Sequence, residues 1–378
     1  MVQSGQGDLA AILFTSGSTG AAKGVLYTHS IFRAQSLAIK EMFSLKEGDI
    51  DLAAFPLFGL FSLASGASVC FPDMNPAKPA RANPKKLIRH IKDLKITCAN
   101  GSPAIWKRVA NFATEKKLTL PGLEKLIMFG APVSNKLHLQ YKNILVDGTT
   151  YTPYGATESL PISLVSAREL FNGAMESSYQ GRGTCVGHLV PEVEIKIIAP
   201  HEERLTPDNL KILPTNQIGE ILVSSPFVTP GYFSNANATS LSKYYDGERL
   251  WHRMGDMGYL DDEQQLWFCG RKSHSFLLDQ KRLHSTPIEG VFYQNNQIDR
   301  CALIPLTQNG EKSACLVVEE TRAFDKEKIE KELLKLAKEN PHTQSVSKIV
   351  FYKKFPVDPR HNIKIDREKL AKDIQERM

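Results

Sequence analysis

The residues best suited to chemistry form a short polar loop near the start of the chain, from Thr15 to Gly24. Most of them are Gly, Ser or Thr, so the loop offers backbone N–H and hydroxyl donors, and Lys23 adds a positive charge. Such a loop can bind phosphate. It is not a Walker loop, because Ala22 and Gly24 stand where that motif needs Gly and then Ser or Thr. A loop of this composition is also a common surface connection, so the rest of the sequence must decide.

Four further blocks follow the loop and support a nucleotide site. They are Gly-Ala-Pro at 130–132, Thr-Pro-Tyr-Gly-Ala-Thr-Glu at 152–158, an Asp-containing block at 253–261, and Phe-Cys-Gly-Arg at 268–271. Each charged residue has a plain structural interpretation when it is taken alone. Asp256 could be a turn acid, Glu158 a charge at the start of a helix, and Lys364 one of many lysines near the C-terminus. Their joint order favours the functional interpretation.

The elements that must position these residues belong to an α/β protein. Short apolar runs alternate with amphipathic stretches over the first two thirds, which predicts a mostly parallel sheet covered by helices. Strands separated by Pro, Gly and Asn predict a smaller, β-barrel-like subdomain at about 190–270. Residues 1–272 are thus expected to form a large domain and 273–378 a small, mobile α+β domain. In the latter, the sequence predicts a hairpin across Asn309-Gly310, a helix over 325–340, a strand at 349–352 and a final helix over 366–377.

Composition excludes several classes of protein. The chain has 378 residues, of which 42% are hydrophobic and 23% charged, so disorder, collagen and coiled coil are excluded. The net charge is only +6, with acidic and basic residues interleaved near the C-terminus, which argues against a nucleic-acid partner. The six cysteines are far apart and form no C-x-x-C pair, so we expect reduced thiols, a cytoplasmic location and neither a disulfide framework nor a zinc site.

Residues 52–72 include no charged side chain and are nominally long enough to cross a bilayer. Pro56, Gly59, Gly66 and three serines interrupt the stretch. We therefore expect a buried strand, helix and strand of the α/β domain in place of a transmembrane segment.

The order of the blocks resembles the AMP-forming acyl-adenylate superfamily, which includes acyl-CoA synthetases, luciferases and the adenylation domains of peptide synthetases. Within it, residues 55–58, 154–161, 251–256, 266–274 and 359–370 look most like the β-lactone synthetases of bacterial olefin biosynthesis. The resemblance spans nearly the whole chain. It implies an ATP-dependent enzyme of lipid metabolism that activates a fatty or β-hydroxy fatty acid as an acyl-adenylate and releases pyrophosphate. Intramolecular β-lactone formation would then release AMP.

The resemblance also implies a role for each site residue, with ATP and Mg²⁺ as the bound groups. The loop over the β- and γ-phosphates would be formed by Thr15, Ser16, Gly17, Ser18, Thr19, Gly20 and Lys23. Adenine would lie between a backbone segment and an aromatic ring, formed by Gly130, Ala131, Pro132, Tyr154 and the adjoining Gly155. Thr157 would bond the α-phosphate, Glu158 would hold Mg²⁺, and Asp256 would bind the ribose hydroxyls with Arg271 nearby. Lys364 would be the cation that bridges the attacking carboxylate and the α-phosphate.

Three positions depart from the usual superfamily pattern. Asn362 and Ile363 precede Lys364 where many relatives have Gly before the lysine, and this form recurs in the olefin-pathway group. Lys272, Ser273 and His274 replace an acidic hinge. Gln280, Lys281 and Arg282 occupy the stretch where a glycine usually approaches the pantetheine arm of coenzyme A. Because only glycine permits that close backbone approach, we expect the β-hydroxyl to be the acceptor in place of coenzyme A.

The largest departure is at the front, since full members of the superfamily place a substantial α/β segment before the phosphate loop. We therefore expect exposed apolar surface, and as partners a small-molecule acid, ATP, a missing N-terminal fragment or enzymes of the same pathway. The acyl pocket is expected near Phe58, Ser102 and Gly155. Two alternatives stay open: a fatty acyl-CoA ligase, and a truncated remnant that binds nucleotide without catalysis.

Overall fold

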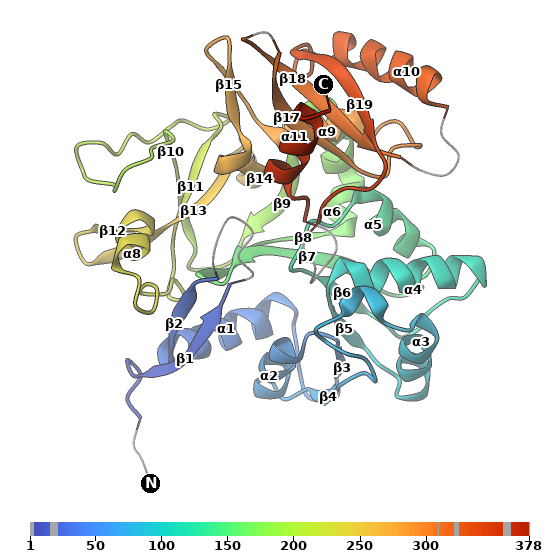
Figure 1. The fold of residues 1–378 in the computed structure, drawn as a ribbon. Helices are drawn as coiled ribbons and strands as arrows, with labels where there is room; N and C mark the ends of the chain where they lie inside the picture. Colours follow the sequence, from blue (N-terminus) through green and yellow to red (C-terminus); the bar gives the residue numbers. More distant parts are fainter. Residues whose placement is uncertain (1–3, 16–21, 309, 321–324, 358–363, 378) are drawn as a thin grey trace.

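The computed structural model describes the chain except residues 1–3, 16–21, 309, 321–324, 358–363 and 378. Its centre is a twelve-stranded mixed sheet in the strand order β10-β11-β13-β14-β9-β8-β7-β6-β5-β3-β4, with β12 paired to β13. Figure 1 shows this sheet running across the molecule, with the C-terminal elements in orange and red at the top of the view, above its middle strands. The chain is therefore of the expected α/β class.

One half of the sheet is parallel. Its strands are β3 (Ile50–Ala53), β4 (Ser68–Cys70), β5 (Cys98–Gly101), β6 (Lys125–Met128) and β7 (Thr149–Ala156). The helices associated with it are α1 (His29–Met42), α2 (Pro56–Ala64), η1 (Pro79–Arg81), α3 (Pro84–Asp93), α4 (Pro103–Glu115) and α5 (Asn135–Lys142). Trp106, Leu52 and Leu126 belong to the core between these strands and helices. Burial of these apolar side chains holds the helices on the sheet.

The other half of the sheet is antiparallel. Its strands are β8 (Ser159–Ser166), β9 (Thr184–Leu189), β10 (Glu194–Ile198), β11 (Gly219–Ser224), β12 (Lys243–Asp246), β13 (Arg249–Leu260) and β14 (Gln265–Arg271). Short helical segments lie beside them: α6 (Ala167–Glu169), η2 (Leu170–Ala174), α7 (Met175–Ser177), η3 (Ser178–Arg182) and α8 (Ala236–Ser242). The β-rich region expected at about 190–270 is present. Strands β8 and β9 connect it by hydrogen bonds to the parallel half.

The N-terminal segment forms a separate two-stranded hairpin of β1 (Leu9–Phe14) and β2 (Gly24–Thr28). Thr15 N–H donates to the Lys23 carbonyl at 3.0 Å, and Lys23 N–H donates to Thr15 Oγ1 at 3.2 Å. These two bonds close the base of the polar loop. The loop thus connects two antiparallel strands, and no helix follows it directly as in a Walker loop.

The C-terminal part has its own sheet and core. A hairpin of β15 (Phe276–Leu278) and β16 (Lys281–Leu283) follows η4 (Lys272–His274), and β17 (Cys301–Gln308), β18 (Glu311–Glu319) and β19 (Val346–Tyr352) form a three-stranded sheet. The helices are α9 (Ser285–Phe292), α10 (Lys326–Glu339) and α11 (Arg367–Gln375). Asp325 and Asp366 cap α10 and α11 with their side chains, as expected for helix starts. The hairpin, helices and strand predicted for this part are confirmed.

Residues 52–72 form the predicted strand, helix and strand, contributed by β3, α2 and β4. In the described part of the chain, no helix is both long and apolar enough to span a membrane. The expected exposed apolar surface is also present. Among the described residues up to position 72, the large apolar side chains that are more than half exposed are Leu9, Phe14, Leu37, Leu60, Leu63 and Phe71.

Asp51 on β3 is a fully buried carboxyl group that forms no ion pair with any described residue. It accepts hydrogen bonds from Ser62 Oγ at 2.6 Å and from Asn100 Nδ2 at 2.9 Å. Burial disfavours the carboxylate and raises the pKa of Asp51 to about 6, although both hydrogen bonds oppose this shift. The side chain therefore links β3, α2 and β5 at a cost that depends on pH.

That cost predicts the pH dependence of stability. In the unfolded chain Asp51 ionises near its ordinary pKa of about 4, so the folded state loses relative stability as pH rises from about 4 through about 6. Asp51→Asn lacks this titration. Between pH 4 and pH 8 the free energy of unfolding of the wild type should fall relative to the variant by about 3 kcal/mol. Denaturant unfolding at both pH values measures this difference. The prediction would be contradicted if the free energies of unfolding of wild type and Asp51→Asn differed by the same amount at pH 4 and pH 8.

Candidate active site

The turn at Thr157 and Glu158 joins β7 to β8 and is held by distant parts of the chain. Tyr27 O–H donates to the Thr157 carbonyl at 2.6 Å. Thr229 donates to the Glu158 carbonyl twice, from its N–H at 3.0 Å and from Oγ1 at 3.1 Å. Gly155 precedes the turn, and a Cβ there would lie only 2.9 Å from Leu160 Cβ, so the hairpin requires glycine at this position. Thr157 and Glu158, two of the three predicted catalytic residues, thus lie on one anchored turn.

The Glu158 carboxylate connects this turn with the end of the phosphate loop. Tyr232 O–H donates to Glu158 Oε1 at 2.7 Å, and Lys23 Nζ lies 5.0 Å from the centre of the Tyr232 ring. Burial and the negative charge of Glu158 raise the pKa of the Tyr232 phenol well above its ordinary value, so Tyr232 remains a donor at neutral pH. Glu158 and Lys23 therefore face one region from two separate hairpins.

A second cluster joins three predicted residues from three strands. Tyr154 O–H on β7 donates to Asp256 Oδ2 on β13 at 2.7 Å, and Arg271 Nη1 at the end of β14 lies 3.0 Å from Asp256 Oδ1. Asp256 and Arg271 are direct register partners. Burial raises the pKa of Asp256, and the Arg271 charge opposes that shift.

Asp256 retains acceptor capacity for a ligand. Its Oδ1 atom is buried and accepts no well-directed hydrogen bond from any described residue, despite its ion pair with Arg271. A carboxylate offers about four acceptor positions, of which Tyr154 uses one. The site therefore fits the vicinal hydroxyls of a ribose, as the resemblance implies.

The segment expected to contact adenine lies at the same edge of the sheet. Gly130, Ala131 and Pro132 follow β6, and Gly130 has a φ of +87°, which glycine adopts without strain. Strands β6 and β7 are parallel, with Ile127 opposite Tyr151, so the carboxyl end of β6 lies beside Tyr154. An aromatic ring and a backbone segment that meet in this way can enclose a planar base.

The metal expected at Glu158 is compatible with the side chains present. Among the residues that the structure describes, no group of three or more His, Cys, Asp or Glu side chains could hold a metal ion. Mg²⁺ does not need such a group, because it is usually bound by one or two carboxylates together with phosphate oxygens and water. Glu158 beside a phosphate loop fits this pattern.

One part of the predicted site lies outside the residues that the structure describes. Ser16, Gly17, Ser18, Thr19 and Gly20 lie outside the described residues, so their predicted phosphate contacts stay predictions.

Lys364 is described and lies between an isolated β-bridge, Val357 with Ile365, and the start of α11. Burial lowers the pKa of His274 to about 4, and the positive charges of Arg367, at the start of α11, and of Arg271 contribute to this shift. His274 is thus close to both the start of α11 and the nucleotide cluster.

Several residues of the site were not found from the sequence. They are Tyr27, Thr229, Tyr232, Lys243 and His252. The Pro-Gly before Tyr232 is a turn signal that could have drawn attention to that tyrosine. Lys243 and His252 carry no local signal, since only strand pairing places them near Glu158.

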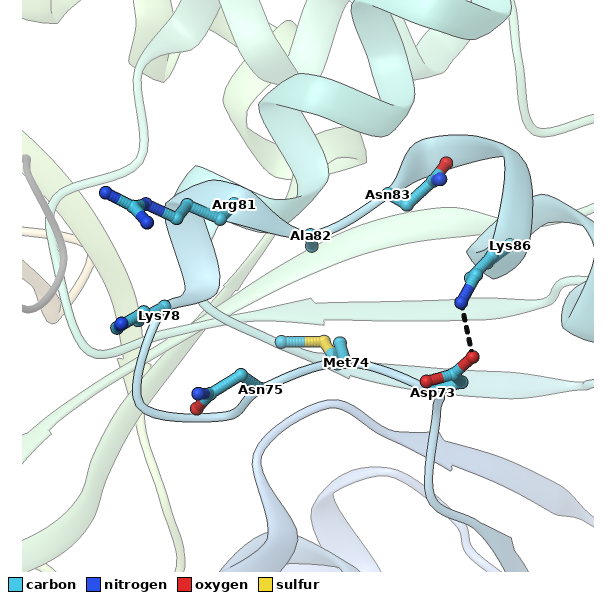
Figure 2. A pocket seen from close by; sticks show the side chains of 8 residues that line it. All are labelled: Asp73, Met74, Asn75, Lys78, Arg81, Ala82, Asn83 and Lys86. Carbon is cyan, nitrogen blue, oxygen red and sulfur yellow. Dashed lines mark hydrogen bonds and ion pairs between the residues drawn. The ribbon is translucent and has the colours of Figure 1, made fainter.

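A surface hollow between η1 and α3 is unrelated to this site. It is lined by Asp73, Met74, Asn75, Lys78, Arg81, Ala82, Asn83 and Lys86 (Figure 2). Lys86 and Asp73 form an ion pair across it at 2.5 Å, and none of the predicted site residues lines it. Surface side chains of this kind do not form a built ligand site.

The mixed sheet, the Glu158 turn and the cluster of Tyr154, Asp256 and Arg271 are typical of a nucleotide-binding enzyme. The chain belongs to the AMP-binding enzyme family, which matches residues 2–233. It is 37% identical over 96% of its length to the olefin β-lactone synthetase of Xanthomonas campestris and, over the same share, 37% identical to that of Stenotrophomonas maltophilia. The chain covers 66% of each of these relatives.

Solved structures agree with the fold. ATP-bound MatB from Rhodopseudomonas palustris aligns with a TM-score of 0.76 at 20% identity, over 99% of this chain and 70% of MatB. MenE from Bacillus subtilis, in complex with ATP and magnesium ion, aligns with a TM-score of 0.73 at 22% identity, over 97% of this chain and 70% of MenE. The resemblance drawn from the motifs is therefore confirmed at the level of the family and the fold.

Replacement of Asp256 by Asn tests the ribose cluster. Asparagine has nearly the same shape as aspartate but is not a charge-assisted acceptor. A hydrogen bond to a charged group is worth about 1.5–3 kcal/mol, so the affinity for AMP should fall about 10- to 100-fold. Pyrophosphate affinity should fall much less, because pyrophosphate lacks the ribose hydroxyls that Asp256 would bind. Asp261→Asn is the matched control, since Asp261 accepts from Trp267 Nε1 at 2.7 Å on the same strand pair. Calorimetric titrations that gave equal losses for AMP and pyrophosphate would contradict the assignment.

Proposed function

We propose that this chain activates a fatty or β-hydroxy fatty acid with ATP and converts the acyl-adenylate to a β-lactone. The observation that carries the proposal is the placement of two ligand clusters in one region, the Tyr154, Asp256 and Arg271 cluster for adenosine and the Glu158 and Lys23 cluster for phosphate. The identity to two olefin β-lactone synthetases supports the choice of reaction.

In the first half-reaction a substrate carboxylate oxygen attacks the α-phosphorus of ATP, an oxygen–phosphorus bond forms, and pyrophosphate leaves. Thr157 is proposed to bond the α-phosphate, and Lys364 to lie between the two reacting anions. Charge on the phosphoryl oxygens rises in the transition state, so a fixed cation stabilises it more than the ground state. Mg²⁺ held by Glu158 would neutralise phosphate charge.

In the second half-reaction the β-hydroxyl oxygen attacks the acyl carbon, the hydroxyl proton is lost, and AMP leaves with the carboxyl oxygen that bridged it to the acyl group. We favour this acceptor over coenzyme A because the turn of the β15–β16 hairpin carries side chains in place of glycine. Asp279 and Gln280 both have positive φ values there, 48° and 63°. A coenzyme A arm would have to pass these side chains.

The acyl chain is proposed to lie beside the carboxyl ends of β3, β5 and β6. Phe58 on α2 stacks with Phe129 after β6 at a ring distance of 5.3 Å, and Ser102 caps α4 at the end of β5. We further propose that residues 273–378 move as a unit about a hinge near Ser273, which would bring Lys364 to the phosphate.

The deciding experiment incubates the purified protein with ATP, Mg²⁺ and a β-hydroxy fatty acid, and then identifies the products by mass spectrometry. The proposal requires AMP and a β-lactone without coenzyme A. A thioester formed only on addition of coenzyme A would establish the acyl-CoA ligase instead. Nucleotide binding without acid-dependent pyrophosphate exchange would establish a non-catalytic nucleotide-binding protein.

A further inference from the structure

Lys243 is a buried lysine close to the Glu158 turn. It is the first residue of β12, directly after α8, and its residue is only 6% exposed. Its Nζ donates to Thr229 Oγ1 at 3.3 Å and forms no ion pair with any described carboxylate. A buried ammonium without a carboxylate contact is costly, so its retention needs a reason beyond packing.

Thr229 connects this lysine to the candidate metal ligand. Its N–H and Oγ1 both donate to the Glu158 carbonyl, at 3.0 Å and 3.1 Å. With its proton directed to that carbonyl, Thr229 Oγ1 can accept from Lys243 through a lone pair. A chain of two hydrogen bonds therefore runs from Lys243 to the backbone of Glu158.

The side chains around these two hydrogen bonds carry more positive than negative charge. Lys23, Lys243 and Arg271 all act on His252, the register partner of Lys243 on β13. Burial and these three cations lower the pKa of His252 far below its ordinary value, and its Nδ1 has no hydrogen-bond partner in the described part of the chain. Burial lowers the pKa of Lys243 to about 7, and Glu158 opposes that shift. Arg271 is paired with Asp256, so Lys23 and Lys243 are the two cations that remain beside the single carboxylate of Glu158, an arrangement that favours a bound anion.

We propose that Lys243 is a positioning residue of the nucleotide site, which holds the Glu158 turn through Thr229 and adds a buried positive charge that attracts the polyphosphate. This inference rests on the proposed ATP site. It requires Lys243 to act on two ligands in opposite directions. A fixed cation strengthens the binding of an anion and weakens the binding of a metal cation at the neighbouring carboxylate.

The test compares wild type with Lys243→Met by direct binding at about pH 6, where Lys243 is protonated. The probes are metal-free ATP, adenosine and Mn²⁺, measured by calorimetry and, for Mn²⁺, by electron paramagnetic resonance. Loss of one charge at short range should weaken ATP binding about three- to tenfold and tighten Mn²⁺ binding about two- to fivefold. Adenosine affinity should not change, because Tyr154 and Asp256 bind that part.

Two further variants separate charge from packing. Lys243→Arg retains the charge and should keep ATP affinity within about twofold of the wild type. Lys196→Met is the matched control, since Lys196 lies 4.2 Å from the centre of the Trp251 ring and forms its ion pair with Asp246 at 2.8 Å. Its binding constants should equal those of the wild type.

The outcomes distinguish this inference from the proposed function. If wild type binds neither ATP nor adenosine, the proposed function and the inference both fail. If wild type binds both ligands and Lys243→Met loses them to the same degree, or loses neither, only the inference fails. A loss of both ATP and Mn²⁺ binding would also refute the inference, because loss of a merely structural lysine would weaken the binding of both ligands.

Discussion

Replacement of Lys364 by Ala should lower acid-dependent AMP formation about 10²- to 10³-fold, because removal of one donor to a developing anion costs this much in comparable sites. Affinity for ATP should change little, since the adenosine cluster and the Glu158 turn belong to the large sheet. Pyrophosphate exchange and direct ATP binding together measure the two effects. The change should therefore appear in kcat and hardly in the dissociation constant of ATP.

Lys369 provides the matched control for this prediction. It lies on the exposed side of α11, five residues further along the chain. Its backbone N–H donates to the capping side chain of Asp366 at 3.0 Å, and its own side chain is exposed. Lys369→Ala should retain wild-type exchange. An equal loss in both variants would mean that the C-terminal part had been disturbed as a whole, and retention of exchange in Lys364→Ala would exclude Lys364 as the adenylation lysine.

Replacement of Arg253 by Met should lower the free energy of unfolding by about 3–5 kcal/mol, because it leaves the buried carboxylate of Glu220 without its main partner. The two side chains are 5% and 2% exposed, with Arg253 Nη2 2.7 Å from Glu220 Oε2. Arg253 also donates to the Glu203 carbonyl at 2.7 Å and to the carbonyl of His201. The guanidinium thus fixes the loop after β10 against β11 and β13.

The double variant Arg253→Met with Glu220→Met separates the lost pair from the unpaired charge. Replacing both partners by apolar groups removes the buried carboxylate, so we expect the double variant to recover much of the stability that the single variant loses. The midpoints of denaturant unfolding report this comparison. A double variant that unfolds as readily as Arg253→Met alone would contradict the interpretation.

The sequence predicted the parts of the site that depend on local order. The segment with Tyr154 and Glu158 and the block with Asp256 were recognised because their residue types recur in a fixed order. Tyr154 and Asp256 meet across the sheet once the strands that carry them are correctly predicted. The helix of 325–340 was predicted for similar reasons, as its apolar spacing and its Asp and Asn ends are local signals.

The remaining parts depend on pairing that no local pattern encodes. Lys243 becomes part of the site because β12 pairs with β13, which sets it opposite His252. Tyr27 contributes through the N-terminal hairpin, although the sequence had indicated a strand followed by a phosphate loop without specifying the strand's partner. The β-rich region was predicted as a subdomain, and its hydrogen-bonded continuity with the parallel half follows from β8 and β9.

The bonds that hold the Glu158 turn determine when the site can form during folding. Tyr27 lies 130 residues before its partner in the turn, and Thr229 lies 71 residues after its own. Contacts over such separations carry a large loop-closure cost and depend on packing that other segments must complete first. We therefore expect nucleotide binding to appear late in folding, so that a refolding chain recovers its helix signal before it recovers affinity for ATP.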